Sequence, residues 1–160
     1  YPYLMASDIF LKEAERAYGV PLLSRTSECL ERIRNLALRG KLSCSSSLAD
    51  AIVSAKEDEM MHQRRKQHML AVYALELLCS TLKETKGVTN FMVKMDDTVP
   101  ATPCIVYTGD DAAHADNLFL YVDRQRVLRI IDAEEGIALV TAAYWLFHIK
   151  YSKLLFNTLT

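Results

Sequence analysis

The sequence predicts an α+β fold that is mostly helical, with four to five helices and a small antiparallel three-stranded sheet before a buried C-terminal helix. Three observations support this fold class. Apolar residues recur at helical spacing through 1–88, β-rich runs bounded by proline and glycine follow, and the segment 136–160 is apolar on almost every side. We therefore expect a single domain over 1–160, with a helical part (1–88) and a second part (100–160) that holds the sheet and the C-terminal helix.

The first two helices are marked by their ends. Ser7 can cap a first helix, which Gly19 ends, and Pro21 suits the first turn of a second helix, which stops at Gly40. Because the connection between them is so short, we expect the two helices to pack as an antiparallel or steeply crossed pair.

The serine-rich stretch Ser43–Ser47 predicts a loop whose last serine caps the next helix. From Leu48 a helical pattern continues to about Thr85, but its phase does not carry cleanly through the charged patch around Glu57. The pattern therefore favours either one long helix or two helices with a bend near Glu57.

Three β-rich runs predict the sheet: Cys104–Thr108, Leu118–Val122 and Val127–Ile131. The short connection Asp123–Gln125 indicates that the last two runs form a hairpin. The acidic segment Asp110–Asp116 is expected to be the loop that joins the first strand to this hairpin.

The final apolar segment is expected to be a helix from about Asp132 to the end of the chain. Acidic residues precede it and Lys150 lies toward its other end, which is the charge order that a helix dipole favours. Its uncharged run from Gly136 to Ile149 is shorter than the roughly 20 residues that a bilayer requires, so we expect no membrane span.

Both faces of this helix are apolar, so both need cover. The chain could wrap the helix fully, or one face could meet a partner. Aromatic residues are enriched at binding hot spots. The predicted contact residues are Trp145, Leu146, Ile149 and Tyr144, and the partner would be another protein or a second copy of the chain. The leading hypothesis is thus a non-enzymatic protein-interaction or oligomerisation module.

The alternative hypothesis is a nucleic-acid-associated domain. The most concentrated positive charge is the cluster Arg64, Arg65 and Lys66, flanked by His62 and His68, which could contact phosphates. A solvated helix face explains the same cluster more simply, and the net charge of −1 provides no global field that attracts nucleic acid.

Two weaker patterns are better explained as structural. Glu59 and His62 have the E-x-x-H spacing of a carboxylate-bridged metal site, but the motif occurs once and the di-metal bundles need two copies. Cys104, His114 and Asp116 are the residue types of a thiol nucleophile, base and orienting carboxylate, with nothing in the sequence that makes them converge. We expect no metal, no cofactor and no enzymatic activity.

The four cysteines form no C-x-x-C pair, which favours reduced, buried thiols in an intracellular protein, either cytoplasmic or nuclear. The chain begins at Tyr1 and ends inside an apparently helical run, as an excised domain would.

The sequence AAYWLFHIKYSKLLFNTL, at Ala142–Leu159, resembles the C-terminal segment of uncharacterised metazoan proteins. Some of these proteins carry a sterile-alpha-motif domain, and others are similar to mobile-element products. The resemblance implies a short β-rich stretch leading into an apolar helix. It implies no activity and no catalytic residues.

Overall fold

The computed structural model describes residues 7–40, 45–82 and 91–147, and within these it is an α+β structure. The described helices are α1 (Ser7–Tyr18), α2 (Leu22–Leu38), α3 (Ser46–Glu57), α4 (Gln63–Thr81) and α6 (Ala133–Leu146). The described strands are β1 (Met92–Lys94), β2 (Cys104–Thr108), β3 (Asn117–Val122) and β4 (Gln125–Ile130).

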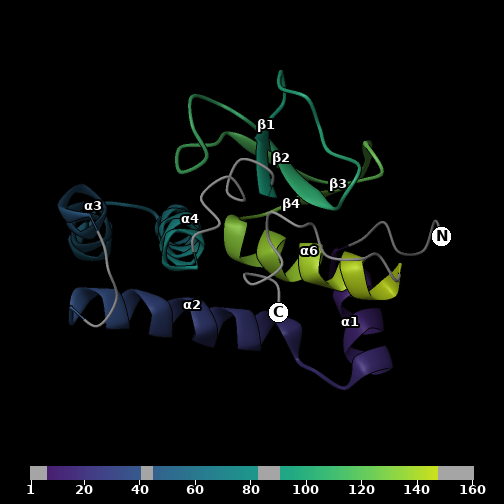
Figure 1. The fold of residues 1–160 in the computed structure, drawn as a ribbon, viewed down its shortest axis with the longest axis horizontal. Coiled ribbons are helices and arrows are strands. Elements are labelled where there is room, and N and C mark those ends of the chain that lie inside the picture. Colours follow the sequence, from purple (N-terminus) through teal and green to yellow (C-terminus); the bar gives the residue numbers. More distant parts are fainter. Residues whose placement is uncertain (1–6, 41–44, 83–90, 148–160) are drawn as a thin grey trace.

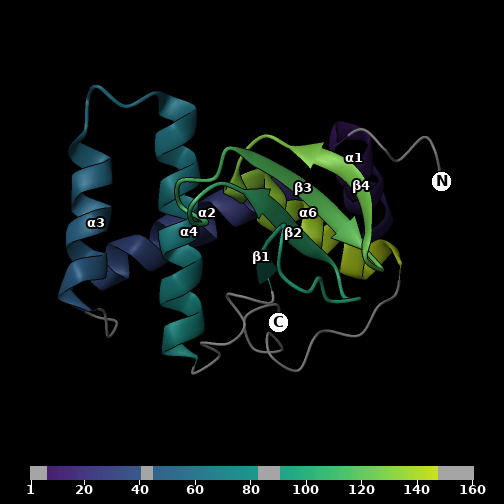
Figure 2. The same ribbon diagram turned by 90° about the horizontal axis from the view of Figure 1, so that it is seen from above.

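The elements are stacked in layers, with α6 in the middle (Figure 1). The sheet lies on one side of α6 and α2 crosses on the other, while α4 and then α3 stand beside it (Figures 1 and 2). Helix α6 contacts α1, α2 and α4 as well as β2, β3 and β4. The main hydrophobic core therefore surrounds α6.

Both faces of α6 are buried, as the sequence predicts for its apolar composition. Leu139 and Val140, which point in different directions around the helix, are both fully buried. The prediction of a helix to the end of the chain is wrong in one respect, because α6 ends at Leu146 with Phe147 as its C-cap. Residues 148–160 lie outside the described residues.

Gly136 allows this close packing on the sheet. A Cβ atom built at Gly136 would lie 2.6 Å from Cδ1 of Ile105 on β2 and 3.4 Å from Cγ2 of Ile130 on β4. Helix α6 therefore approaches the sheet at a position where no side chain intervenes.

The sheet has four strands in the order β1-β2-β3-β4, which corrects the expected three-stranded antiparallel sheet. The three predicted strands are present and pair antiparallel. The additional strand, β1, pairs parallel with β2, with Met92 opposite Ile105. It lies between the two predicted parts of the chain and is only three residues long, so it shows no alternating pattern in the sequence.

The β3–β4 hairpin turns at Asp123 and Arg124, which have φ values of 53° and 62°. Positive φ at both central residues is the requirement of the two-residue turn that best matches strand twist. The loop between β1 and β2 supports this strained pair, because Asp123 N donates to Ala101 O at 3.0 Å and Arg124 Nε donates to Val99 O at 3.1 Å.

The ends of the first two helices agree with the predictions, whereas Pro21 is the N-cap of α2 rather than a residue of its first turn. Gly19 directly follows α1 and has a φ value of 68°. Gly40 follows Arg39, the C-cap of α2, and has a φ value of 73°.

Residues 45–82 decide between the predicted single long helix and two helices, and they correct the predicted N-cap residue of α3. Two helices are present rather than one long helix, since α3 ends at Glu57. The cap of α3 is Ser45 rather than the last serine of the loop, because Ser45 Oγ accepts from Leu48 N at 3.2 Å. The predicted end of the helical part, at residue 88, lies outside the described residues.

Over the ranges that the structure describes, none of the helices combines the length and the apolar character needed to cross a bilayer.

Candidate anion-binding pocket

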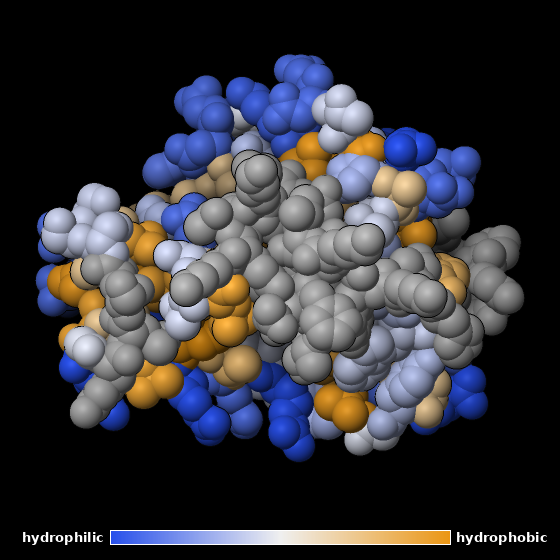
Figure 3. All heavy atoms as spheres, in the orientation of Figure 1, coloured by the Kyte–Doolittle hydropathy of each residue, from blue (hydrophilic) through white to orange (hydrophobic). Residues whose placement is uncertain are grey.

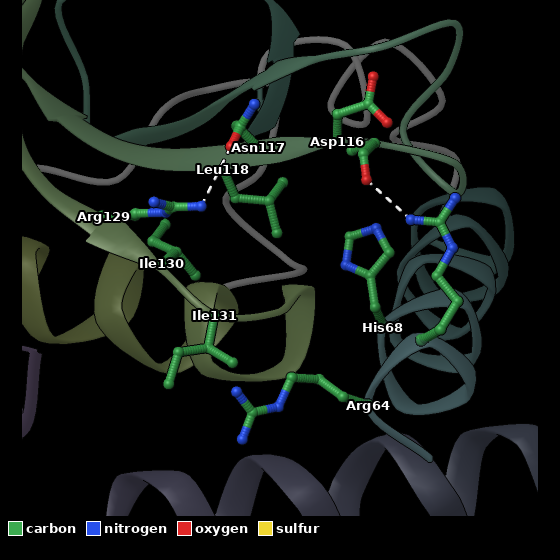
Figure 4. A pocket seen from close by; sticks show the side chains of 10 residues that line it. Arg64, His68, Asp116, Asn117, Leu118, Arg129, Ile130 and Ile131 are labelled. Carbon is green, nitrogen blue, oxygen red and sulfur yellow. Dashed lines mark hydrogen bonds between the residues drawn. The ribbon is translucent and has the colours of Figure 1, made fainter. Parts of the chain in front are cut away.

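A pocket of about 480 Å³ opens between the first turns of α4, the start of β3 and the end of β4 (Figure 4). Three arginines from two elements line it: Arg64 and Arg65 on α4, and Arg129 on β4. Its other lining residues are His68, Ala115, Asp116, Asn117, Leu118, Ile130 and Ile131. The pocket therefore has a basic rim and an apolar floor.

Two of the arginines are held by neutral oxygen atoms. Arg65 Nη1 donates to the backbone oxygen of Ala115 at 2.8 Å, and Arg129 Nη2 donates to Oδ1 of Asn117 at 3.2 Å (Figure 4). Since a guanidinium group has five N–H donors, each of these arginines keeps donors for a ligand.

Arg64 is exposed and stands at the second position of α4. Its backbone N–H donates to Nδ1 of His62, the N-cap residue, at 3.2 Å. Among the described residues, the guanidinium of Arg64 forms no ion pair, and those of Arg65 and Arg129 form none either. The positive charge of the pocket is therefore not neutralised by a paired carboxylate within that part of the chain.

Asp116 is the one carboxylate in the lining. Its side chain points away from His68 and Leu118 in Figure 4, on the far side of the Ala115–Arg65 hydrogen bond. It weakens the field of the arginines without occupying the pocket.

His68 forms the buried wall of the pocket and is 4% exposed. Its Nδ1 accepts from Ala133 N at 2.9 Å, so Nδ1 carries no proton and Nε2 donates to Ala112 O at 2.8 Å. Burial lowers the pKa of His68, with smaller lowering effects from Arg65 and His114, against the raising effects of the Ala112 bond and Asp132. His68 is thus a neutral side chain that ties α4 to the loop before β3 and to the start of α6.

The predicted basic cluster is divided by the structure. Arg64 and Arg65 line the pocket, whereas Lys66 turns toward α3, where its Nζ donates to Lys56 O at 3.3 Å. Arg129 was not among the predicted site residues. The sequence does carry one indication of its position, because a polar residue between apolar Leu128 and Ile130 on a strand is expected to face outward.

The predicted contact residues on the C-terminal helix lie in different environments. Tyr144 is 1% exposed, Trp145 and Leu146 are half-buried against the main core, and Ile149 lies outside the described residues. The Tyr18 ring lies 5.2 Å from the Trp145 ring, and Tyr18 Oη donates to Trp145 O at 2.7 Å. The last residues of α6 are therefore partly open, as are Glu135, Ile137 and Thr141 earlier in the helix.

The two weak patterns do not form sites. Glu59 and His62 lie in the turn between α3 and α4, not on one helix face, because α4 begins at Gln63. Within the described ranges, no group of three or more His, Cys, Asp or Glu side chains could hold a metal ion.

Cys104 is the first residue of β2, whereas His114 lies in the loop beyond the other end of that strand. Cys104 is fully buried against Val93 and Val106, and burial raises its pKa to about 12. Nδ1 of His114 lies 2.8 Å from Oδ1 of Asp111 on the surface. The structure thus does not bring this thiol and this imidazole together.

Hydrophilic side chains gather over the sheet and its loops, at the top of Figure 3, and hydrophobic residues appear in patches at the left, around α2, α3 and α4.

No protein-family model matches the chain, and comparison with characterised proteins and with solved structures also finds no match. The resemblance at Ala142–Leu159 stays a prediction.

Proposed function

We propose that this chain is a non-enzymatic binding module that recognises an anionic group in the arginine pocket. The observation that carries the proposal is the convergence of Arg64, Arg65 and Arg129, none of which is paired with a carboxylate of the described residues. The proposal retains the predicted role of Arg64 and Arg65 and replaces Lys66 with Arg129.

The chemistry of the pocket favours an oxyanion such as a phosphate group. Guanidinium groups present planar pairs of N–H donors that match two oxygens of a phosphate or carboxylate. The apolar floor of Leu118, Ile130 and Ile131 lowers the local dielectric constant, and this strengthens the attraction between the arginines and a bound anion.

A titration with inorganic pyrophosphate, followed by ¹H–¹⁵N NMR at low ionic strength, tests the proposal. We expect the largest shifts at the amides of residues 64–68, 115–118 and 129–131, with saturation in the millimolar range or below. The double variant R64E/R129E should bind at least tenfold more weakly, since two attractions become repulsions.

The matched control is R25E, a charge reversal at an exposed arginine of α2, on the side of α6 away from the sheet. It should bind pyrophosphate as the natural chain does. Shifts that are spread over the whole surface, or equal losses in R25E and R64E/R129E, would contradict the proposal.

A second candidate function is contact with another protein, or with a second copy of the chain, at the end of α6. It is supported by the pair of Tyr18, which is 43% exposed, and Trp145, which is half-buried beside it. Aromatic side chains of this kind supply large contact area at low entropy cost.

A further inference from the structure

The pocket is continuous with the outer face of the sheet, which is the face turned away from α6. Arg129 and Asn117 line the pocket and also belong to this face. Arg129 lies opposite Phe119 in the β3–β4 register, and Phe119 is two residues from Asn117 on β3, a step of about 7 Å.

A bulge in β4 places a second arginine on the same face. Residues three apart on a regular strand point to opposite faces. The register shift between Leu120 and Tyr121 leaves Val127 as an extra residue, so that Arg126 pairs with Tyr121 while Arg129 pairs with Phe119. Both arginines therefore lie on the same face of the sheet as Phe119. A β-bulge commonly changes the face on which a side chain lies in this way.

Phe119 and Arg126 form a stacked pair. The guanidinium carbon of Arg126 lies 4.5 Å from the centroid of the Phe119 ring. Phe119 belongs to none of the three hydrophobic clusters formed by the described residues, and Arg126 is exposed. The outer plane of the guanidinium is consequently available for a second planar group.

We propose that the ligand is a single-stranded nucleic acid, with one phosphate in the pocket of Arg64, Arg65 and Arg129 and a neighbouring base stacked on the outer plane of Arg126. The inference rests on the proposed anion-binding function and names its ligand class. The three pocket arginines match the charge of a backbone phosphate, and the Phe119–Arg126 stack matches the flat face that an unpaired base presents.

The stacked pair distinguishes this ligand from other anionic partners. A phosphorylated peptide would use the pocket but has no need of a planar platform beside it. A duplex would present its phosphates while its bases stay stacked inside. Of these three ligands, the unpaired strand is the one that uses the charge and the platform together.

The experiment measures binding of fluorescein-labelled 12-nucleotide oligo(dT) and oligo(U) by fluorescence polarisation, as a function of salt concentration. The variant R126K keeps the charge and removes the planar group, and the variant F119L keeps the apolar bulk and removes the ring. We expect each to weaken binding 5- to 100-fold with an unchanged salt slope, since stacking does not release counterions.

The double variant R64A/R129A tests the phosphate contacts. It should reduce the magnitude of the salt slope by about 0.7, because the pocket holds one phosphate and each neutralised phosphate of a single strand contributes about 0.7. R25A is the control for lost positive charge, and circular dichroism with thermal melts checks that each variant is folded. A conservative variant, F119Y, keeps the ring and should retain binding, which separates loss of stacking from loss of fold.

The outcomes separate this inference from the proposed function. If polyphosphate or a phosphoserine peptide binds as tightly as the oligonucleotides, and R126K and F119L bind unchanged, the pocket is an anion site and the nucleic-acid inference is overturned. If the chain binds neither pyrophosphate nor the oligonucleotides, both are overturned.

Discussion

At the scale of single residues, His68 connects the site to the stability of the fold. Its two ring nitrogens hold Ala133, the first residue of α6, and Ala112, in the loop before β3. A proton added at Nδ1 would remove the acceptor of the Ala133 N–H in a buried environment. The protonated form is therefore incompatible with the observed hydrogen bonds.

This arrangement predicts a loss of stability on acidification. The pKa of folded His68 lies below its ordinary value of 6.5, so the unfolded chain binds the proton more readily. Its contribution should be complete above pH 6.5 and should decline as the pH falls from 6.5 toward the pKa of the folded state. Urea unfolding of the natural chain between pH 5 and 7.5 measures this decline.

The variant H68A isolates the contribution. It should lose about 2–4 kcal/mol at pH 7, since it leaves a buried N–H and a part-buried carbonyl without partners, and its stability should vary less between pH 5 and 6.5. Glu76 contributes in the opposite direction, because burial and Asp111 raise its pKa, but it does so equally in both proteins. H62N, which replaces an exposed histidine by a residue that can still cap α4, is the control. Parallel pH curves for H68A and the natural chain would contradict the assignment.

At the scale of elements, the packing of α6 on the sheet depends on Gly136. Alanine is normally favoured over glycine inside a helix by about 1 kcal/mol. Here the added Cβ would meet Ile105, which is fully buried and cannot move away freely. Overpacking of this kind typically costs about 1–3 kcal/mol.

We therefore expect G136A to be less stable than the natural chain by about 1 kcal/mol, despite its better helix propensity. The variant I105V removes the Cδ1 atom that lies nearest to the added methyl group. On its own I105V should cost about 1 kcal/mol, and in the G136A background it should cost less or stabilise. A double-mutant cycle by chemical denaturation checks the coupling. A G136A protein more stable than the natural chain would show that Ile105 moves aside at little cost.

The elements that could be predicted are those whose ends carry local signals. Gly19 and Gly40 marked the ends of the first two helices because left-handed backbone there favours glycine. Three strands were predicted from β-rich runs between turn residues. Strand β1 could not be, because its pairing with β2 depends on a contact between distant segments and on no local pattern.

The arginine pocket could be predicted only in part, for the same reason. Arg64 and Arg65 are adjacent in the sequence and were recognised as a cluster. Arg129 joins them through the fold, and Arg126 reaches the face of Phe119 only through a bulge, which the sequence pattern does not reveal. The C-terminal cap of α6 at Phe147 likewise carries no local breaker residue.

At the scale of the whole molecule, the position of α6 limits where a partner can bind through it. Most of its side chains pack against the sheet and α1, α2 and α4, and the proposed protein contact uses the end marked by Tyr18 and Trp145. If that end forms the second proposed interface, size-exclusion chromatography with light scattering should give twice the chain mass of 18.1 kDa at high concentration.

The variant Y18K should then return the mass to that of one chain, since a charged side chain at an apolar contact is costly to desolvate. L38K is a matched control, because Leu38 is also the last residue of its helix and is similarly exposed, at 38% against 43%. A single-chain mass for the natural protein, or equal effects of the two variants, would remove the interface at α6.

The place of β4 in the strand order has a practical consequence for handling the molecule. No described strand continues the sheet beyond β4, so its outer backbone groups resemble those that recruit foreign strands into aggregates. Cationic side chains such as Arg126 and Arg129 disfavour the pairing of another strand with this edge. Protein that lacks both charges should therefore be stored dilute and checked for turbidity, since misassembled material would mimic a defect in ligand recognition.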